Sequence, residues 1–382
     1  MTQTRRLRVG VVGVGLIAQT AHLPNLALLR DKFEVAQLCD ASVELAGRIA
    51  QQLEGRPTVT DDWREVCTNS QLDAVLILTP GGHGDQVGVA LDSGLHVLSE
   101  KPLCYSPEEA HELAAKASGA ALVLQVGYMK MYDPILPKVR DLMTRIGTIR
   151  SVRVTVLHPA DEVQYDPLSV IRSSQVNAAV LESGLAYHEE RVRASTAGAP
   201  VELAELYANV LLGSVVHELS LLRAVGFELP ETFDYAAVSQ RGDATPGEPP
   251  CICAYARLKG DAQLHLSWNW LPDYPEYGEE LAIFGTAGRL YLAMPGPYFG
   301  AQRATLTAKL FEGEVTETSD FHAFPRTAFF HELDSFHSAI VDGAPIVADA
   351  DGAGRDTRCL QSLLSAIVES QAAATTTPGA TP

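Results

Sequence analysis

A glycine-rich turn near the N-terminus has the residue types and spacing that can hold a phosphate. Gly13, Gly15 and Ala18 follow the apolar run Leu7–Val12 and open a helix-like stretch. The first glycine permits a tight turn, the second lets a pyrophosphate approach the backbone, and the small alanine lets the helix pack closely on the strand. The free N–H groups and the dipole of the helix then favour the phosphate charge. We predict a dinucleotide-binding turn with contacts from Gly13, Gly15, Leu16 and Ile17.

A carboxylate stands where it can select between two dinucleotides. Asp40 directly follows the second apolar run, Phe33–Cys39, and the next arginine along the chain is Arg48. A carboxylate at this position accepts hydrogen bonds from a ribose diol and repels a 2′-phosphate. The sequence therefore favours NAD as cofactor, with NADP still possible.

The elements around these residues predict a parallel sheet. Short apolar runs alternate with helix-like stretches over the first 125 residues, which is typical of a doubly wound α/β fold. Ser106 and Pro107 form a good helix start, since serine caps the helix and proline suits its first position. The expected strands are Leu7–Val12, Phe33–Cys39, Ala74–Leu78, His96–Leu98 and Leu122–Val126.

After Asp133 the pattern changes to adjacent strands with short turns, which predicts an open antiparallel sheet in an α+β domain. A helix-like, alanine-rich stretch, 174–224, interrupts this region, and two helices follow at about 327–342 and 353–371. We predict a Rossmann domain over residues 1–127 and a substrate and oligomerisation domain over residues 128–371. The last helices of the second domain can pack back on the first, and residues 372–382 are expected to be a disordered tail.

Several motifs at the ends of the expected strands resemble those of a known family. Glu100-Lys101-Pro102 ends one strand, Thr79-Pro80 ends another with His83 just beyond, and the run 125–134 follows a third. Together they resemble the glucose–fructose oxidoreductase/inositol dehydrogenase (Gfo/Idh/MocA) family, densely over residues 7–145 and more thinly to about 370. The resemblance implies a Rossmann domain joined to a large open antiparallel sheet.

The resemblance also implies an activity, which is hydride transfer between NAD(P) and a carbinol or ketone of a sugar-like or cyclitol-like substrate. It places Lys101 beside the nicotinamide ring, where a lysine can take the hydroxyl proton and stabilise a developing alkoxide. A free lysine has a pKa near 10.4, and burial and the positive ring would lower it toward ~7–8. The cofactor-binding residues implied by the matching motifs are Thr79, Pro80, His83, Glu100 and Lys101.

A second family motif is only partly present. Family enzymes often carry an Asp four residues before a His on one helix, with a second Asp shortly after. His217 stands at the histidine position, but Gly213 and Ser220 replace the two acids. Lys101 and His217 are therefore the expected catalytic pair. A lone histidine on an apolar helix is also often a core residue. Candidates for the missing acid are Glu182, His188 and Glu189.

Other residues are candidates for substrate binding. Tyr128 and Lys130 alternate after the strand that ends near 126, so they could line a substrate floor together with His217, or form a strand edge with one solvated face. Trp268, Trp270 and Tyr274 form an aromatic group at the end of a strand. Aromatic faces suit sugar C–H surfaces and subunit interfaces equally well.

Composition narrows the class of protein. The chain has 382 residues and a formal net charge of −18. Such a charge repels phosphate backbones and anionic membranes, so we expect neither nucleic acid nor membrane as a partner. Six scattered cysteines do not suit a disulfide framework and indicate a reduced, cytoplasmic protein with small buried thiols. The sequence shows no metal-site spacing.

Two further classes remain open beside a dehydrogenase. One is an enzyme of the same fold that uses tightly held NAD for glycoside cleavage or elimination, and the other is a non-catalytic, nucleotide-sensing regulator. For any of them we expect a homodimer or homotetramer, because an open antiparallel sheet leaves an apolar face that must be covered. Arg5 and Arg6 before an apolar run could pass for a signal, but a buried strand entering a glycine turn explains them better.

Overall fold

The computed structural model describes residues 5–196, 199–298 and 302–376. The chain forms two compact units, and each is discontinuous in sequence. Unit 1 comprises Met1–Tyr132, Ser169–Ala197 and Arg326–Thr357, and unit 2 comprises Asp133–Leu168, Gly198–Pro325 and Arg358–Pro382. The sequence analysis expected continuous domains, so the inclusion of 169–197 in unit 1 is a difference from it.

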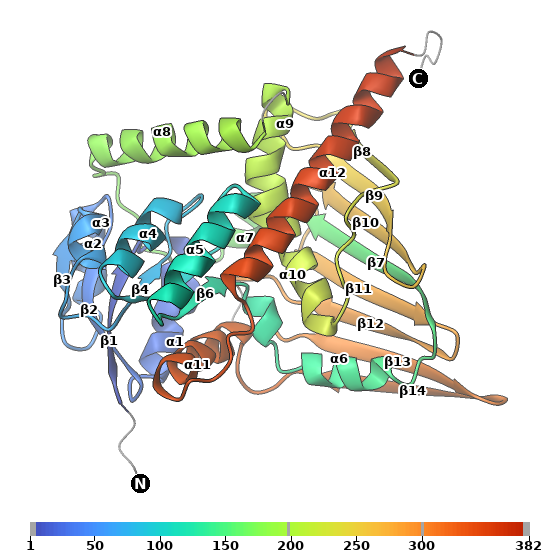
Figure 1. Ribbon diagram of the computed structural model, residues 1–382, viewed down its shortest axis with the longest axis horizontal. Coiled ribbons are helices and arrows are strands. Elements are labelled where there is room, and N and C mark those ends of the chain that lie inside the picture. The colour runs from blue at the N-terminus through green and yellow to red at the C-terminus, as the bar shows by residue number, and fades with distance from the viewer. Residues whose placement is uncertain (1–4, 197–198, 299–301, 377–382) are drawn as a thin grey trace. The chain divides into compact units, whose positions relative to one another are not determined.

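Unit 1 is built on a six-stranded parallel sheet with the strand order β3-β2-β1-β4-β5-β6 (Figure 1). This arrangement confirms the doubly wound α/β class. The order reverses between β1 and β4, and open sheets bind ligands outside the carboxyl ends of the strands at such a point. The strands are β1 (Leu7–Val12), β2 (Phe33–Cys39), β3 (Thr58–Thr60), β4 (Ala74–Ile77), β5 (His96–Glu100) and β6 (Leu124–Gly127).

Helices connect and cover these strands. Ser42, Asp62 and Ser106 each accept a hydrogen bond from a backbone N–H of the first helical turn, as N-caps do. The helical elements are η1 (Ala18–His22), α1 (Leu23–Leu28), α2 (Val43–Ala50), α3 (Trp63–Cys67), α4 (Gly84–Asp92), α5 (Pro107–Gly119), η2 (Met129–Tyr132), α8 (Ala178–Ser195) and α11 (Ala328–Val341). The first turns of α12 (Ala350–Thr376) also belong to unit 1.

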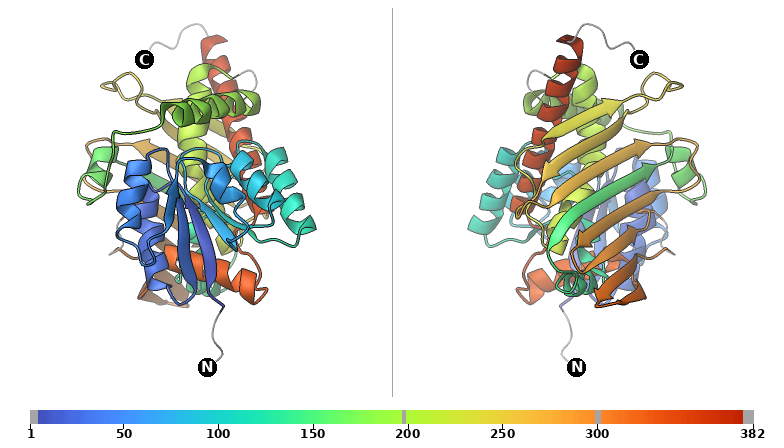
Figure 2. Two further views of the ribbon diagram at one scale, coloured as in Figure 1. Left: turned by 90° about the vertical axis from the view of Figure 1, so that its left-hand side faces the viewer. Right: turned by 90° about the vertical axis from the view of Figure 1, so that its right-hand side faces the viewer.

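Unit 2 is built on an eight-stranded sheet with the order β14-β13-β12-β11-β7-β10-β9-β8 (Figure 2, right). All neighbours are antiparallel except β7 and β10, which pair in parallel, so the expected antiparallel sheet is in fact mixed. Alternate residues are buried, as Ile252, Ala254 and Ala256 show. The strands are β7 (Ile149–His158), β8 (Tyr235–Ser239), β9 (Cys251–Arg257), β10 (Gln263–Trp270), β11 (Gly278–Gly285), β12 (Gly288–Met294), β13 (Thr305–Glu312) and β14 (Val315–His322).

The helices of unit 2 include α6 (Leu136–Met143), α7 (Asp161–Tyr165), α9 (Val201–Leu206), η3 (Tyr207–Val215) and α10 (Val216–Val225). The continuous run Val201–Val225 is long and apolar enough to cross a membrane, with a mean hydropathy of 1.3. However, 72% of its most apolar window is buried inside the structure. A buried core helix of a folded unit passes the same test of length and hydropathy.

Three expectations about the elements need correction. The strands β3 and β14 were not expected, because each is short of apolar residues and β14 is largely exposed. Helix α12 continues to Thr376, so the predicted disordered tail is wrong for residues 372–376, while 377–382 lie outside the described residues. Four cysteines are buried as expected, but Cys251 is half-buried and Cys253 is exposed.

Candidate nucleotide-binding and catalytic site

The glycine turn has the geometry that a bound dinucleotide requires. Gly13 has a φ of +91°, and a Cβ there would lie 2.9 Å from the Leu78 carbonyl carbon and the Thr79 nitrogen. At Gly15, a Cβ would meet nothing within 4 Å, so the space beside it is open. Ala18 is fully buried. The backbone conformation and close packing at position 13 thus favour glycine, whereas Gly15 leaves room for a phosphate to approach the helix N-terminus.

Asp40 lies beside the glycine turn. One carboxylate oxygen accepts a hydrogen bond from the backbone N–H of Val14 at 2.9 Å, and the other accepts one from Ser42 N at 2.9 Å. Each oxygen has a further lone pair. The carboxylate is therefore fixed next to the phosphate-binding turn and can still accept hydrogen bonds from a ribose diol.

The surroundings of Asp40 are acidic. Asp61 and Asp62 follow β3, which pairs with β2. The nearest arginine in sequence, Arg48, donates to Glu44 and to the carbonyl of Arg172. A 2′-phosphate at the end of β2 would therefore meet carboxylates, and Arg48 is already engaged with other groups. The residues present thus fit NAD better than NADP.

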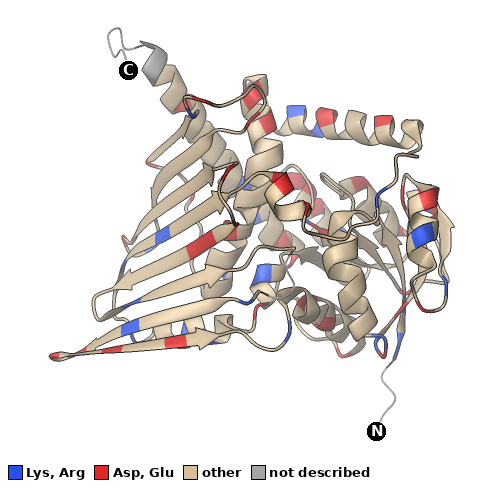
Figure 3. Cartoon of the chain, turned by 180° about the vertical axis from the view of Figure 1, so that it is seen from behind, with Lys and Arg blue, Asp and Glu red and all other residues tan. Residues whose placement is uncertain are grey.

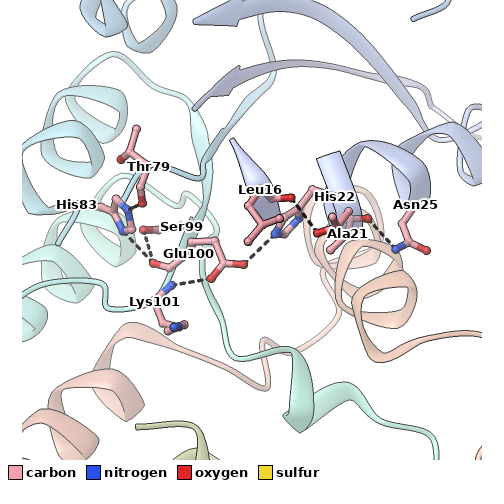
Figure 4. Close-up of polar contacts among 10 residues, drawn as sticks. Leu16, Ala21, His22, Asn25, Thr79, His83, Ser99, Glu100 and Lys101 are labelled. Carbon is pink, nitrogen blue, oxygen red and sulfur yellow. Dashed lines mark hydrogen bonds and ion pairs between the residues drawn. The ribbon is translucent and has the colours of Figure 1, made fainter. Parts of the chain in front are cut away.

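His83 ties together the two turns that carry the family motifs. Its Nδ1 lies 2.9 Å from the carbonyl oxygen of Glu100, and its Nε2 lies 2.7 Å from that of Thr79 (Figure 4). Burial lowers the pKa of His83, so the neutral ring donates to one of these carbonyls at a time. The backbone N–H of His83 also donates to Leu103 O at 2.9 Å. His83 is 1% exposed and so holds the ends of β4 and β5 in register.

Glu100 and Lys101 follow directly on β5. The Glu100 carboxylate is paired with buried His22, with 2.9 Å between Oε1 and Nε2, and its Oε2 accepts the Lys101 N–H at 3.1 Å (Figure 4). Burial by itself would raise the pKa of Glu100, but His22 and Lys101 outweigh it and the pKa is lowered. Glu100 is thus an ionised buried anchor for the backbone that carries Lys101. The Lys101–Pro102 peptide bond is cis.

A second buried carboxyl, Glu332 on α11, lies near this anchor. Glu332 is fully buried, and neither of its carboxyl oxygens has a hydrogen-bond partner among the described residues. Burial raises the pKa of Glu332 well above its usual value, and the charge of Glu100 raises it further. Glu332 is therefore held as the neutral acid. Nothing local in the sequence links Glu332 to Glu100, because α11 is far from β5 in the chain.

Tyr128 and Lys130 are less exposed than the sequence analysis expected. Residues 129–132 form the 3₁₀ turn η2, so the alternation that placed Tyr128 and Lys130 on one face is wrong. Tyr128 is 1% exposed and Lys130 is 2% exposed. Both nevertheless follow the carboxyl end of β6, at the same edge of the sheet as the ends of β4 and β5.

The segment 169–197 is an unexpected part of unit 1. Its helix α8 carries all three candidates for the missing acid, of which Glu182 and Glu189 are exposed. His188 instead contacts the turn after β4, because its Nδ1 lies 2.6 Å from the hydroxyl oxygen of Tyr105. That oxygen also accepts a hydrogen bond from the Gly82 N–H at 2.7 Å, so Tyr105 links His188 to the turn after β4. The structure thus brings only His188 of the three against the motif-bearing turns.

His217 lies on α10 in unit 2 and is 8% exposed. Its carbonyl oxygen accepts a hydrogen bond from the Ser220 hydroxyl at 2.8 Å, so the Ser220 side chain is engaged within its own helix. Gly213 lies in the π-helical stretch η3, whose wider turns do not place residues four apart on one face as in an α-helix. Ser214 accepts a hydrogen bond from the Trp268 ring N–H at 2.9 Å. The helix that carries His217 is therefore tied to β10.

An aromatic group gathers at one end of the unit 2 sheet. His158 stacks on Trp270 with ring centroids 5.5 Å apart and meets the edge of Tyr277 at 5.6 Å. Trp268 lies behind Trp270 at 6.3 Å and is 2% exposed. The predicted group is thus present, with His158 and Tyr277 where the sequence analysis had expected Tyr274.

The residues of unit 1 fit a dinucleotide on the chain's own geometry, through the open space at Gly15, the fixed Asp40 carboxylate and the ordered turns after β4 and β5. Within the described ranges, no group of three or more His, Cys, Asp or Glu side chains could hold a metal ion.

Comparisons with known proteins agree with this geometry. Residues 7–128 match the model of an oxidoreductase family with an NAD-binding Rossmann fold, Gfo/Idh/MocA. The chain is 29% identical over 164 residues to D-xylose 1-dehydrogenase (NADP(+)) 2 of Haloferax volcanii, covering 41% of this chain and 50% of that protein. It is 36% identical over 135 residues to inositol 2-dehydrogenase 4 of Saccharopolyspora erythraea, covering 34% and 38%. The chain thus matches about half or less of the length of these curated relatives.

Solved structures share the fold over nearly the whole chain. UDP-N-acetylglucosamine 3-dehydrogenase GnnA from Acidithiobacillus ferrooxidans superimposes with a TM-score of 0.69 at 21% identity, covering 95% of this chain and 98% of that one. The 3-ketoreductase KijD10 from Actinomadura kijaniata, in complex with NADP, gives 0.68 at 18% identity, covering 96% and 98%. Residues 7–128 define an NAD-binding Rossmann oxidoreductase domain. Residues 7–128 match the Rossmann domain of the Gfo/Idh/MocA family, which confirms the resemblance seen in the motifs.

Proposed function

We propose that this protein is an NAD(P)-dependent oxidoreductase that transfers hydride between the nicotinamide and a carbinol or ketone of a sugar-like or cyclitol-like substrate. The observation that carries the proposal is the placement of Lys101 directly after β5, anchored through ionised Glu100, at the sheet edge that holds the glycine turn. Proteins similar in sequence include dehydrogenases named for xylose, inositol and a glucoside. These names support the substrate class.

The bound nicotinamide would supply the hydride acceptor or donor. Lys101 acts as the general acid–base group at the substrate oxygen. It takes the hydroxyl proton on oxidation and returns it on reduction. Its ammonium form stabilises negative charge on that oxygen. Glu100 does not reach the reaction, because both of its oxygens are engaged with His22 and the Lys101 backbone. It fixes the direction from which the Lys101 side chain leaves the turn.

Candidate substrate-binding residues lie in each of the two units. His217 is the second acid–base candidate, and Tyr128 and Lys130 of unit 1 remain candidates for the substrate floor. The stacked His158 and Trp270 rings present flat faces of the kind that suit sugar C–H surfaces. Since Gly213 carries no acid, proton transfer rests on fewer side chains than in relatives that keep an Asp there.

The test combines a substrate panel with a lysine variant. Purified protein is mixed with NAD and a panel of sugars and cyclitols, and NADH is followed by absorbance at 340 nm. Lys101→Ala should lower kcat at least about a hundredfold on the substrate found, while NAD still binds. Lys101→Arg should restore little, because arginine keeps its charge and does not act as a base near neutral pH.

Lys259→Ala serves as the matched control, because Lys259 is 75% exposed in a surface ion pair with Glu228. Its kcat should stay within about twofold of the unmodified protein. Retention of more than about a tenth of kcat by Lys101→Ala would refute the acid–base assignment. NAD binding without turnover over the whole panel would favour a nucleotide-sensing regulator instead.

We further propose that the protein is cytoplasmic. We also propose that it assembles as a homodimer or homotetramer through the unit 2 sheet. In support, Tyr235 on the edge strand β8 is 54% exposed and Phe311 on β13 is 43% exposed. Charges of both signs are scattered over the strands (Figure 3). One such pair is formed by Arg153 on β7 and Glu280 on β11. A sheet face that carries exposed aromatic side chains and charges of both signs suits contact with a second copy of this chain. A monomer by light scattering at micromolar concentration would exclude this assembly.

A further inference from the structure

We propose that residues 169–177, which we call the strap, together with helix α8 form a gate that a dinucleotide must open to enter or leave unit 1. The inference rests on the proposed nucleotide binding and adds to it a control of exchange. It implies that NAD(H) leaves slowly between turnovers. No motif in the sequence marks the strap as part of the nucleotide-binding unit.

The strap is fastened to the residues that surround the glycine turn. The Ile171 N–H donates a hydrogen bond to Gln19 Oε1 at 2.8 Å, and the Ile171 carbonyl oxygen accepts one from Gln19 Nε2 at 3.0 Å. The same Gln19 amide also donates to the carbonyl of Val14, inside the turn, at 2.9 Å. Ile171 packs in addition on the apolar core of the Rossmann sheet. The strap is thus one side chain away from the phosphate-binding backbone.

The strap next crosses the end of β2. Arg48 donates to the Arg172 carbonyl at 3.0 Å, and the Ser173 hydroxyl donates to the Glu44 carboxylate. Asn177 then closes the strap. Its N–H donates to the carbonyl of Ala41, the residue after Asp40, at 2.7 Å, and its side-chain amide donates to Asp61 at 2.9 Å. The strap therefore contacts Ala41, the residue directly after Asp40, whose carboxylate is proposed to bind the ribose.

Helix α8 begins at this point and reaches the other half of the sheet. In the side view it runs across the carboxyl ends of the strands (Figure 2, left). Its far half is fastened by the Tyr105–His188 hydrogen bond of 2.6 Å, by Tyr187 to Glu109 at 3.4 Å, and by the ion pair of Arg191 with Asp85 at 3.7 Å. The segment is thus held at both ends of the edge where a dinucleotide binds.

The middle of α8 is held less firmly than its ends. Leu181 is 50% exposed and Leu185 is 56% exposed, and of the eighteen residues of the helix only Val192 is buried. A segment fastened by a few polar contacts, with little apolar burial, opens at a low free-energy cost. Opening of the fastened ends, rather than global unfolding, is therefore the step that controls nucleotide exchange.

A gate makes a kinetic prediction that a direct nucleotide contact does not make. If the gate opens before both entry and exit, weakening its fastenings raises the association and dissociation rate constants by the same factor and leaves Kd unchanged. A residue that touches the nucleotide changes the dissociation rate constant and Kd together. The ratio of the two effects therefore separates a gate from a binding contact.

The test uses the double variant Ser173→Ala/Asn177→Ala in the full chain and follows NADH fluorescence by stopped flow. The variant removes the side-chain hydrogen bonds of Ser173 and Asn177 to Glu44 and Asp61, and also the two that they accept from N–H groups within the segment. Both rate constants should therefore rise at least about tenfold while Kd stays within about twofold. Gln175→Ala is the control, because Gln175 is an exposed residue of the same strap whose side chain makes no hydrogen bond or ion pair among the described residues. Its rate constants should match those of the unmodified protein.

A second variant, His188→Ala, releases the other end of α8 and should change both rate constants in the same direction. It keeps the test decisive if circular dichroism shows that the double variant does not fold. Unchanged rate constants in a folded variant would overturn the gate, as would a rise in the dissociation rate constant with an equal rise in Kd. If the unmodified protein binds no NADH at all, the proposed function itself fails.

Discussion

Glu332 offers a sharp test of the buried electrostatics behind the Lys101 turn. Its carboxyl group is fully buried without a hydrogen-bond partner among the described residues, and its pKa is raised well above 4.5 by burial and by the charge of Glu100. The folded protein therefore keeps the proton over a pH range in which the unfolded chain releases it. Stability consequently falls as the pH rises above 4.5, until the folded-state pKa is passed.

The magnitude follows from the linkage relation. Each pH unit above the unfolded pKa costs ~1.4 kcal/mol of unfolding free energy while Glu332 stays protonated in the folded state. Between pH 5 and pH 6.5 the loss amounts to about 2 kcal/mol, after allowance for partial ionisation of the unfolded chain at pH 5. Glu332→Gln keeps the shape of the side chain and removes its titration. From pH 5 to pH 6.5, the unfolding free energy of the variant should therefore rise by about 2 kcal/mol relative to that of the unmodified protein.

The assay is urea-induced unfolding followed by circular dichroism at a series of pH values, with the variant and the unmodified protein compared at each pH. Glu112→Gln is the control, since Glu112 is an exposed residue of α5 in the same unit, and its difference from the unmodified protein should not change with pH. A constant difference for Glu332→Gln between pH 5 and 6.5 would show that Glu332 is ionised in the folded state. The account of this buried cluster would then be wrong.

Three further predictions concern the glycine turn and its acid. Gly13→Ala should lower the unfolding free energy by at least about 2 kcal/mol, because φ is +91° and the new Cβ would meet backbone atoms at 2.9 Å; a normal melting temperature would contradict this. Gly15→Ala should melt normally yet bind NADH at least about tenfold more weakly in calorimetry, because its Cβ would fill only the space left for the phosphate. Asp40→Ser should reduce the preference for NAD over NADP at least about fivefold, and an unchanged ratio of the two Kd values would show that selection lies elsewhere.

Much of unit 1 could be predicted because its signals are local. The turn after β1 must contain Gly13, since no other residue tolerates that φ together with the approach of Leu78. The runs Leu7–Val12 and Phe33–Cys39 have the bounds that the sequence predicts, because apolar residues dominate each run, as they do in strands that are largely buried. The Glu100-Lys101-Pro102 motif placed Lys101 at the end of β5 through its resemblance to the Gfo/Idh/MocA family.

The structure decided the parts of the site that depend on distant residues. His22 and Glu332 lie 78 positions before and 232 positions after Glu100 in sequence, and nothing local to any of the three predicts that they share one buried cluster. The pairing of β7 with β10 in parallel was missed for a similar reason, since adjacent strands with short turns suggest antiparallel neighbours only.

By itself, then, the sequence determined which backbone turns can hold a dinucleotide and which lysine follows them, because φ values, apolar periodicity and strand ends are properties of neighbouring residues. Only the tertiary structure assigned the 169–197 segment to the nucleotide-binding unit. Its contacts include hydrogen bonds that link Ile171, Asn177 and His188 to residues more than 80 positions away in the chain. Polar contacts of that kind leave no periodic pattern in the chain, since each needs only one donor and one acceptor that the fold brings together.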